Sequence, residues 1–212
     1  QILQIDGVVD IDVDTSVRAM LEGPEEADGS PLVSSITGVS AKALDALRDY
    51  VSEGSLDDPA LADGTGIILG EKFRDRYEEM KDWKPGKTIR MELMDGEKIL
   101  RKEFRIAAVT NGPISYGGTW LAMPSDALQS LCETDLTDCF EITVESGMEK
   151  SAAEEIRQLT ADMEYLEIRT YEEAYEEAEK SIGIIISGCY GVLLIFGLIG
   201  MLNLVNTMIN SV

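Results

Sequence analysis

The sequence predicts an α+β fold followed by a single membrane-spanning helix. Strands are indicated where apolar and polar residues alternate, as at positions 9–14 and 89–93. Helices are indicated where apolar residues recur every three to four positions, as at 44–51 and 152–163. The membrane helix is indicated by residues 181–212, which contain no charged side chain.

The uncharged C-terminal run is long enough to cross a bilayer. A helix needs about 20 mostly apolar residues to span the hydrocarbon core. Ile182 to Leu202 provide them, with Ser187 and Tyr190 as weakly polar interruptions. A buried helix of a soluble domain is the alternative, but such helices rarely stay uncharged on every face for so long. We therefore expect residues 181–212 to form a transmembrane helix, whose orientation the flanking charges do not decide.

The first residues predict two strands and a helix. Val9, Ile11 and Val13 alternate with aspartates, which is typical of a strand with one buried and one solvated face. Beyond them we expect a loop at 23–31, an apolar segment at 32–39, and a helix that is capped by Ser40 and ends at Gly54.

The aspartates at positions 10, 12 and 14 are candidate calcium ligands. The EF-hand loop needs Gly at its sixth position and Glu at its twelfth, where this sequence has Thr15 and Leu21. A solvated strand face is therefore the favoured interpretation.

A second set of two strands and a helix is expected near the end of the soluble part. The predicted elements are a strand at 140–144, a helix at 152–163 and a strand at 165–170. Two such sets have the content of a split β-α-β sandwich.

The segment between the two sets predicts a small β-rich insert. It contains an apolar run at 66–69, a helix with Phe73, Tyr77 and Met80 on one side, and a hairpin that turns at Asp95-Gly96. A loop at 112–118, a short strand at 120–123 and a short helix capped by Ser125 complete it.

Composition excludes several classes of function. The chain has no histidine, which excludes Ser-His-Asp and Cys-His catalysis and histidine zinc sites. The phosphate-binding and nucleophile-elbow motifs are missing, so we expect no enzyme activity and no cofactor. A pair of carboxylates working as in a glycosidase stays open, because 40 acidic residues bring some pairs together by chance. The net charge of -22 makes nucleic acid an improbable partner.

Three cysteines are present. Cys132 and Cys139 flank a short polar segment and are candidates for a disulfide under oxidising conditions. Cys189 lies in the membrane helix, where a small packing residue is expected. The sequence begins without Met or a signal-like segment, and we expect a fragment or a mature piece.

Three patterns mark the residues around the start of the apolar run. Thr170 and Glu173 form a capping box. Behind it, one helical face carries the candidate coupling residues of a stalk, Tyr171, Ala174, Tyr175 and Ala178. The repeat Gly183, Ser187, Gly191 is a candidate packing face for another membrane helix, although such spacing also arises by chance. The stalk glutamates are interpreted as a solvated face, with cation or partner binding as the alternative.

Several segments together resemble the FtsX-like/MacB-like ABC transporter permeases. They are ITGVSAKALDALRDYVSEGSL, GIILGEKFRDRYEEMKDWKPGKTIRMEL, FRIAAVTNGPISYGGTWLAMPSDALQSL, and an acidic stalk that runs into LLIFGLIGMLNLVNTMINSV. The resemblance covers nearly the whole chain. Each segment alone is a weak signal, and their order and spacing carry the inference.

The resemblance implies a domain organisation. Residues 1–55 and 138–180 would form a porter-like split β-α-β subdomain, residues 56–137 an inserted β-rich subdomain, and residues 181–212 the second of four membrane helices. Residues 1–180 would lie outside the cytoplasm, at the cell membrane. The stalk helix would continue into the membrane helix.

The resemblance also implies a function and partners. The chain would be the non-catalytic permease subunit of an ABC transporter, paired as a homodimer or with a second permease, in contact with membrane lipid and a cytoplasmic ABC ATPase. It would export or extract a hydrophobic or peptide-like substrate. The alternative is a scaffold that passes ATP-driven motion to an extracellular partner such as a cell-wall hydrolase. A membrane-anchored enzyme is a third, weaker class.

Overall fold

The computed structural model describes residues 2–112, 121–163 and 165–210, with side chains up to residue 200. Contacts divide the chain into two compact units, Asp10–Thr143 and Gln1–Val9 with Val144–Val212. The subdomain boundaries expected from the sequence stay a prediction.

The strands are β1 (Val8–Glu25), β2 (Pro31–Val39), β3 (Val51–Gly54), β4 (Gly66–Gly70), β5 (Thr88–Asp95), β6 (Lys98–Thr110), β7 (Leu121–Pro124) and β8 (Thr137–Val144). The helices are α1 (Ala41–Leu47), α2 (Pro59–Ala62), α3 (Glu71–Arg76), α4 (Ser125–Leu131), α5 (Glu149–Leu159) and α6 (Tyr171–Asn210), with short 3-10 turns η1 (Ile2–Gln4), η2 (Arg48–Tyr50) and η3 (Glu78–Met80).

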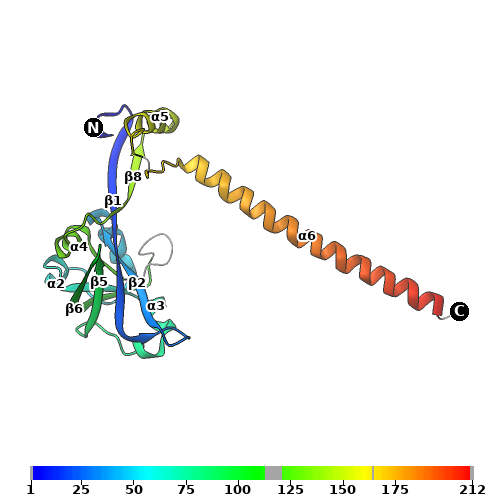
Figure 1. Ribbon diagram of the computed structural model, residues 1–212, viewed down its shortest axis with the longest axis horizontal. Helices are drawn as coiled ribbons and strands as arrows, with labels where there is room; N and C mark the ends of the chain where they lie inside the picture. The colour runs from blue at the N-terminus through cyan, green and yellow to red at the C-terminus, as the bar shows by residue number, and fades with distance from the viewer. Residues whose placement is uncertain (1, 113–120, 164, 211–212) are drawn as a thin grey trace. The chain divides into compact units, whose positions relative to one another are not determined.

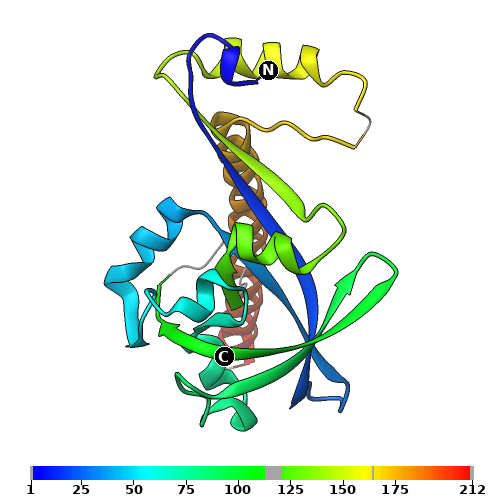
Figure 2. The same ribbon diagram turned by 90° about the vertical axis from the view of Figure 1, so that its left-hand side faces the viewer.

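Six strands close into a ring. Their order is β2-β7-β4-β6-β5-β1, and β1 pairs again with β2, so the sheet returns on itself. The pairs β2–β7 and β4–β6 are parallel and the others are antiparallel. β3 joins the ring through β6, and β8 joins it through β1, so both lie outside it. β1 continues beyond the ring beside β8 (Figures 1 and 2).

The interior of the ring is the main hydrophobic core. Alternate residues of the strands point inward, as Ile89, Met91 and Leu93 do on β5, and pack with Phe104 and Ile106 of β6. A smaller cluster under α1 and α2 contains Val39, Leu61 and Ile68. The ring forms because strands from both ends of Asp10–Thr143 share one apolar interior.

The β5–β6 hairpin confirms the sequence prediction. Asp95 pairs with Lys98, and Gly96 in the two-residue turn has φ +60°, a conformation that favours glycine. The buried Asp95 carboxylate accepts hydrogen bonds from the backbone of Glu133 and Thr134, which fastens the segment after α4. The apolar run at 66–69 is also confirmed as the fully buried strand β4.

The helix expected from Ser40 to Gly54 is correct only in its first half. Ser40 accepts a hydrogen bond from Ala43 N at 3.2 Å, as an N-cap does, but α1 ends at Leu47. Residues 51–54 form β3 instead, and Val51 pairs with Thr110 of β6. A β-branched residue next to an available strand edge favours pairing over helix.

Three other local predictions need correction. The loop expected at 23–31 is shorter, because β1 continues to Glu25 and β2 begins at Pro31. The helix expected through Phe73, Tyr77 and Met80 is interrupted at Tyr77, whose backbone is extended (φ -113°, ψ 129°).

Ser125 is the first residue of α4 rather than its cap, and its hydroxyl is buried without a partner among the described residues. The expected strand at 120–123 is β7, while Trp120 and positions 113–118 of the expected loop lie outside the described residues.

The second set of elements is confirmed for the strand and the helix but not for the last strand. β8 contains the predicted residues 140–144, and α5 buries Ala152, Ala153 and Ile156. α5 ends at Leu159, so Met163 lies outside it and is 61% exposed. Residues 165–170 form no strand. Their backbone groups are used elsewhere, because the Ile168 carbonyl accepts from Arg157 and Thr170 N donates to Glu173.

Candidate functional site

One continuous helix joins the acidic stalk to the apolar run. α6 extends over 40 residues, Tyr171–Asn210, which corresponds to about 60 Å at 1.5 Å per residue. The stalk is residues 171–180 of this helix. Within the described part of the chain, Tyr171–Gly200 is the one helix whose length and composition would allow it to cross a membrane, and no residue of its most apolar stretch is buried. Figure 1 shows α6 as an unbroken ribbon, which confirms the predicted continuity of stalk and membrane helix.

The first turn of α6 is fixed by the predicted capping box. Thr170 Oγ1 accepts from Glu173 N at 3.2 Å, and Glu173 Oε2 accepts from Thr170 N at 2.9 Å. This reciprocal pair satisfies two backbone donors at the start of the helix. The beginning of the stalk is therefore defined by its own sequence.

Basic residues of α5 bind the start of the stalk. Arg157 Nη2 donates to both carboxylate oxygens of Glu173, at 2.8 and 2.9 Å, and to the Ile168 carbonyl at 3.3 Å. Lys150 Nζ lies 3.0 Å from Glu172 Oε2. We call these basic residues, Glu172, Glu173 and the described linker residues 160–163 and 165–170 the junction. The hydrogen bonds from Thr170 N and then from Arg157 hold the pKa of Glu173 below its usual value.

The linker supplies one more cation to the stalk. Arg169 lies 2.7 Å from Glu167 and 3.3 Å from Glu177. The predicted solvated face of stalk glutamates is therefore partly occupied by basic partners from the same unit. Sequence reasoning missed these partners. The available signal was that Lys150 and Arg157 are seven residues apart, which places them on the same face of α5.

The other predicted residues of α6 lie exposed on the helix. Tyr171 and Tyr175 stack with ring centroids 6.4 Å apart, on the face that also carries Ala174 and Ala178. Their predicted coupling role stays a prediction. At Gly183 and Gly191 an added Cβ would meet nothing within 4 Å, and Ser187 Oγ donates to the Gly183 carbonyl at 2.8 Å. The helix-packing face at Gly183, Ser187 and Gly191 likewise stays a prediction.

The cysteines are free thiols in this structure. Cys132 directly follows α4 and packs against the main core, and burial followed by the charge of Asp95 raises its pKa. Cys139 is exposed on β8, but partial burial of its thiol and then the charge of Asp14 raise its pKa. The disulfide expected between Cys132 and Cys139 under oxidising conditions is not formed here and stays a prediction.

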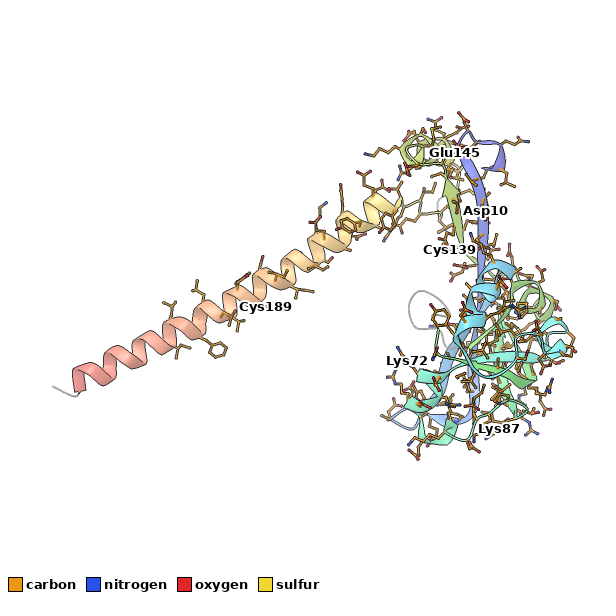
Figure 3. The ribbon with its side chains drawn as sticks, turned by 180° about the vertical axis from the view of Figure 1, so that it is seen from behind. Asp10, Lys72, Lys87, Cys139, Glu145 and Cys189 are labelled. Atoms are coloured by element: carbon orange, nitrogen blue, oxygen red, sulfur yellow. The ribbon has the colours of Figure 1, made fainter. Side chains whose placement is uncertain are left out.

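The aspartates of β1 lie beside acidic residues of β8. We call residues 10–14 with 138–143 the ribbon; Figure 3 labels Asp10 and Cys139 on it. Partial burial raises the pKa of Asp14, and the charges of Glu141, Asp12 and Asp138 raise it further. Across the described residues, no group of His, Cys, Asp and Glu is arranged to hold a metal ion. The expected contrast between a buried and a solvated face is not found here, because Val9 is 60% exposed and Ile11 and Val13 are half-buried like Asp12 and Asp14.

A cleft of about 690 Å³ lies on the outer side of β1, β5 and β6. Met20, Arg90, Arg101, Lys102 and Glu103 are among the residues that line it. Arg90 is paired with Glu103 at 2.7 Å, and Arg101 with Glu92 at 2.7 Å. The charges of this cleft are therefore largely neutralised within the sheet.

Known proteins give structural matches only. No protein-family model matches the chain, and no curated protein sequence matches it. One similar solved structure is the extracellular domain of the noncanonic ABC-type transporter YknZ from Gram-positive bacteria, with 17% identity, a TM-score of 0.49, and coverage of 76% of this chain and 79% of that one. Another is the periplasmic region of MacB from Actinobacillus actinomycetemcomitans, with 14% identity, a TM-score of 0.47, and coverage of 75% and 71%.

With TM-scores below 0.5 and identities below 25%, these matches carry no argument about this chain. The long apolar part of α6 agrees with a membrane protein.

Proposed function

We propose that this chain is the non-catalytic permease subunit of an ABC transporter, with residues 1–180 outside the cytoplasm. The observation that carries the proposal is the junction: a helix long enough to leave the membrane begins at a capping box and is bound to α5 by Arg157. A displacement of the apolar segment along its axis would therefore reach α5 through a continuous backbone and an ion pair. The sequence resemblance to the FtsX-like/MacB-like permeases supports the same assignment.

The partner implied by this proposal is a cytoplasmic ABC ATPase. The chain has no phosphate-binding loop of the Gly-x-x-x-x-Gly-Lys-Ser/Thr type, so ATP would be bound by another subunit. The split β-α-β arrangement with its boundaries at 55, 138 and 181 belongs to the same proposal. So do the pairing as a homodimer or with a second permease, the contact with membrane lipid, and the helix-packing role of Gly183, Ser187 and Gly191. The substrate would be hydrophobic or peptide-like.

The test is to break the stalk without changing its length. Glu176→Pro places proline in the middle of the stalk, where it removes a helical hydrogen bond and costs about 3 kcal/mol. Glu176→Gln is the matched control, because it removes the same charge and keeps the helix. Both variants are assembled with the ATPase in lipid nanodiscs, and hydrogen exchange in α5 is followed on addition of ATP.

We expect ATP to change exchange in α5 in the wild type and in Glu176→Gln, and to leave α5 unchanged in Glu176→Pro while ATP turnover continues. An equal response in both variants would contradict mechanical coupling through the stalk. Failure of the wild type to bind any ABC ATPase would contradict the permease assignment. If the coupled complex moves no substrate but activates an extracellular hydrolase, the scaffold function replaces transport.

A further inference from the structure

The outward side of β1, β5 and β6 is one continuous surface. Met20 lies opposite Glu92, and Glu92 lies opposite Arg101 on the next strand. Arg90 and Glu103 form the neighbouring pair. Side chains that lie opposite each other share a face of a sheet, and the alternate residues of β5 are buried in the core, so these side chains point outward. We call the outward side chains of residues 18–22, 90–94 and 99–103 the balanced face.

Four charges of the balanced face form a square of alternating sign. Arg90 Nε donates to Glu103 Oε1 at 2.7 Å, and Arg101 Nε donates to Glu92 Oε1 at 2.7 Å. Along β5 the order is Arg90 then Glu92, and along β6 it is Arg101 then Glu103. Each charge therefore has an opposite charge beside it, both along its own strand and across to the next.

The balanced face differs from the rest of the chain in net charge. Its charged side chains are three arginines and three glutamates: Arg18, Arg90, Arg101, Glu22, Glu92 and Glu103. Because these cancel, the net charge of -22 arises entirely from the rest of the chain. Two copies of so acidic a chain repel each other in general, but not where these two faces meet.

Apolar side chains are exposed beside the square. Met94 and Ile99 lie opposite each other on β5 and β6 and are 37% and 63% exposed. Met20 is half-buried on β1, and its neighbour Val33 on β2 is 46% exposed. Methionine and arginine are enriched at protein interfaces, and burial of such apolar area favours association. The balanced face therefore has the composition of an interface.

The balanced face is complementary to itself in charge and in shape. A two-fold axis that runs along the strands, in the plane of the sheet and through the centre of the square, places each arginine of one copy over a glutamate of the other. A twisted sheet is saddle-shaped, and such an axis superimposes a saddle on itself, so the hollow of one copy receives the raised part of the other. The cleft of about 690 Å³ lies on this face and is such a hollow.

We propose that the balanced face is the surface on which two copies of this chain pack, sheet against sheet, about such an axis. An acidic partner would find no excess of positive charge here, and a basic partner would be attracted more strongly to the remaining, acidic surface. The permease proposal includes pairing but names no surface outside the membrane. This inference does not rest on that proposal, because the face lies within Asp10–Thr143 and its test needs no ATPase.

The test measures association of the full chain in detergent micelles, which are kept in large excess so that copies seldom share a micelle by chance. Copies carry a donor or an acceptor dye at the C-terminus, and energy transfer between them is followed on dilution. Two variants change the square, Arg101→Glu and Glu92→Arg. The matched control is Lys72→Glu, which changes the net charge as much as Arg101→Glu does, at an exposed residue of α3 beside β4.

We expect the wild type to associate, and each variant of the square to associate at least about tenfold more weakly, because like charges then face each other. An equal mixture of Arg101→Glu and Glu92→Arg should regain most of the affinity, because an acidic face then meets a basic one. This recovery would also show that both variants are folded. Lys72→Glu should keep the affinity within about twofold.

Four results would overturn the proposal. The first is no energy transfer in the wild type at the highest protein concentration. The second is equal loss of affinity in Arg101→Glu and Lys72→Glu, which would mean that net charge alone controls association. The third is a mixture of Arg101→Glu and Glu92→Arg that associates no better than either variant alone. The fourth is association that neither variant of the square weakens, which would assign the contact to the membrane helix.

Discussion

The ribbon and the start of the stalk carry the same type of charge in opposite surroundings. In the ribbon, Asp14 lies close to Glu141 and other acids, and its pKa is raised. At the stalk, Glu173 accepts from Thr170 N and Arg157, and its pKa is lowered. The carboxylate of Glu173 is bound by a cation within the protein, whereas the ion pair recorded in the described part of the ribbon is Lys42 with Asp10. The effect of an acidic residue on stability therefore depends on which groups the fold places beside it.

Among the variants that test this comparison, reversal of the charge at Arg157 should change amide exchange the most. Arg157→Glu removes the hydrogen bonds to Glu173 and Ile168 and places a further acid at the junction, so the start of the stalk should lose its attachment to α5. We expect amide exchange at residues 168–173 to rise about tenfold. Arg157→Lys, which keeps the charge, should show a much smaller rise. Unchanged exchange in Arg157→Glu would mean that the junction is held by other contacts.

Removal of the cap should have the next largest effect. Thr170→Ala deletes the oxygen that accepts from Glu173 N, and loss of a cap costs about 1 kcal/mol. Amide exchange in the first turn of α6 should therefore become about fivefold faster. Thr170→Ser keeps the hydroxyl and should resemble the wild type. If the alanine and serine variants behave alike, the cap does not fix the helix start.

Neutralisation of an acid in the ribbon should stabilise the protein slightly. Asp14→Asn removes a charge that its surroundings disfavour, and we expect the midpoint of thermal unfolding to rise by about 1–2 °C. Asp10→Asn is the control, because Asp10 is paired with Lys42 and its loss should give no gain. A decrease in the midpoint for Asp14→Asn would show that the acidic face is already compensated.

Acidification should stabilise the ribbon and destabilise the start of the stalk. The pKa of Asp14 is raised above the ordinary 3.8, so Asp14 is protonated in the folded protein before it is protonated in the unfolded chain. As the pH falls through this raised pKa, its unfavourable charge is removed and the ribbon gains stability. The lowered pKa of Glu173 means that its contribution is complete above the ordinary 4.5 and is lost as pH falls below it. Exchange protection, corrected for intrinsic rates, should rise in β8 and fall in residues 171–174 as the pH is lowered. Parallel changes would contradict the assignment of the two environments.

The local signals of the sequence were sufficient for several elements. The β5–β6 hairpin follows from alternation and from Gly96 in its turn, and the capping box follows from two residues three positions apart. The uncharged run predicts α6 because length and composition alone determine whether a helix can span a bilayer. In each case the interacting groups are close in the chain, so their pattern can be seen without the fold.

Tertiary partners decided what the local signals could not. Residues 51–54 form a strand because β6 offers them an edge, although the apolar spacing favoured a helix. Residues 166–170 form no strand because Arg157 and the cap use their backbone groups. The closure of the ring and the pairing of stalk glutamates with Lys150 and Arg157 join residues distant in sequence. A sequence determines its short-range hydrogen bonds and its solvent preference, while the choice among long-range partners depends on which surfaces the folded chain brings together.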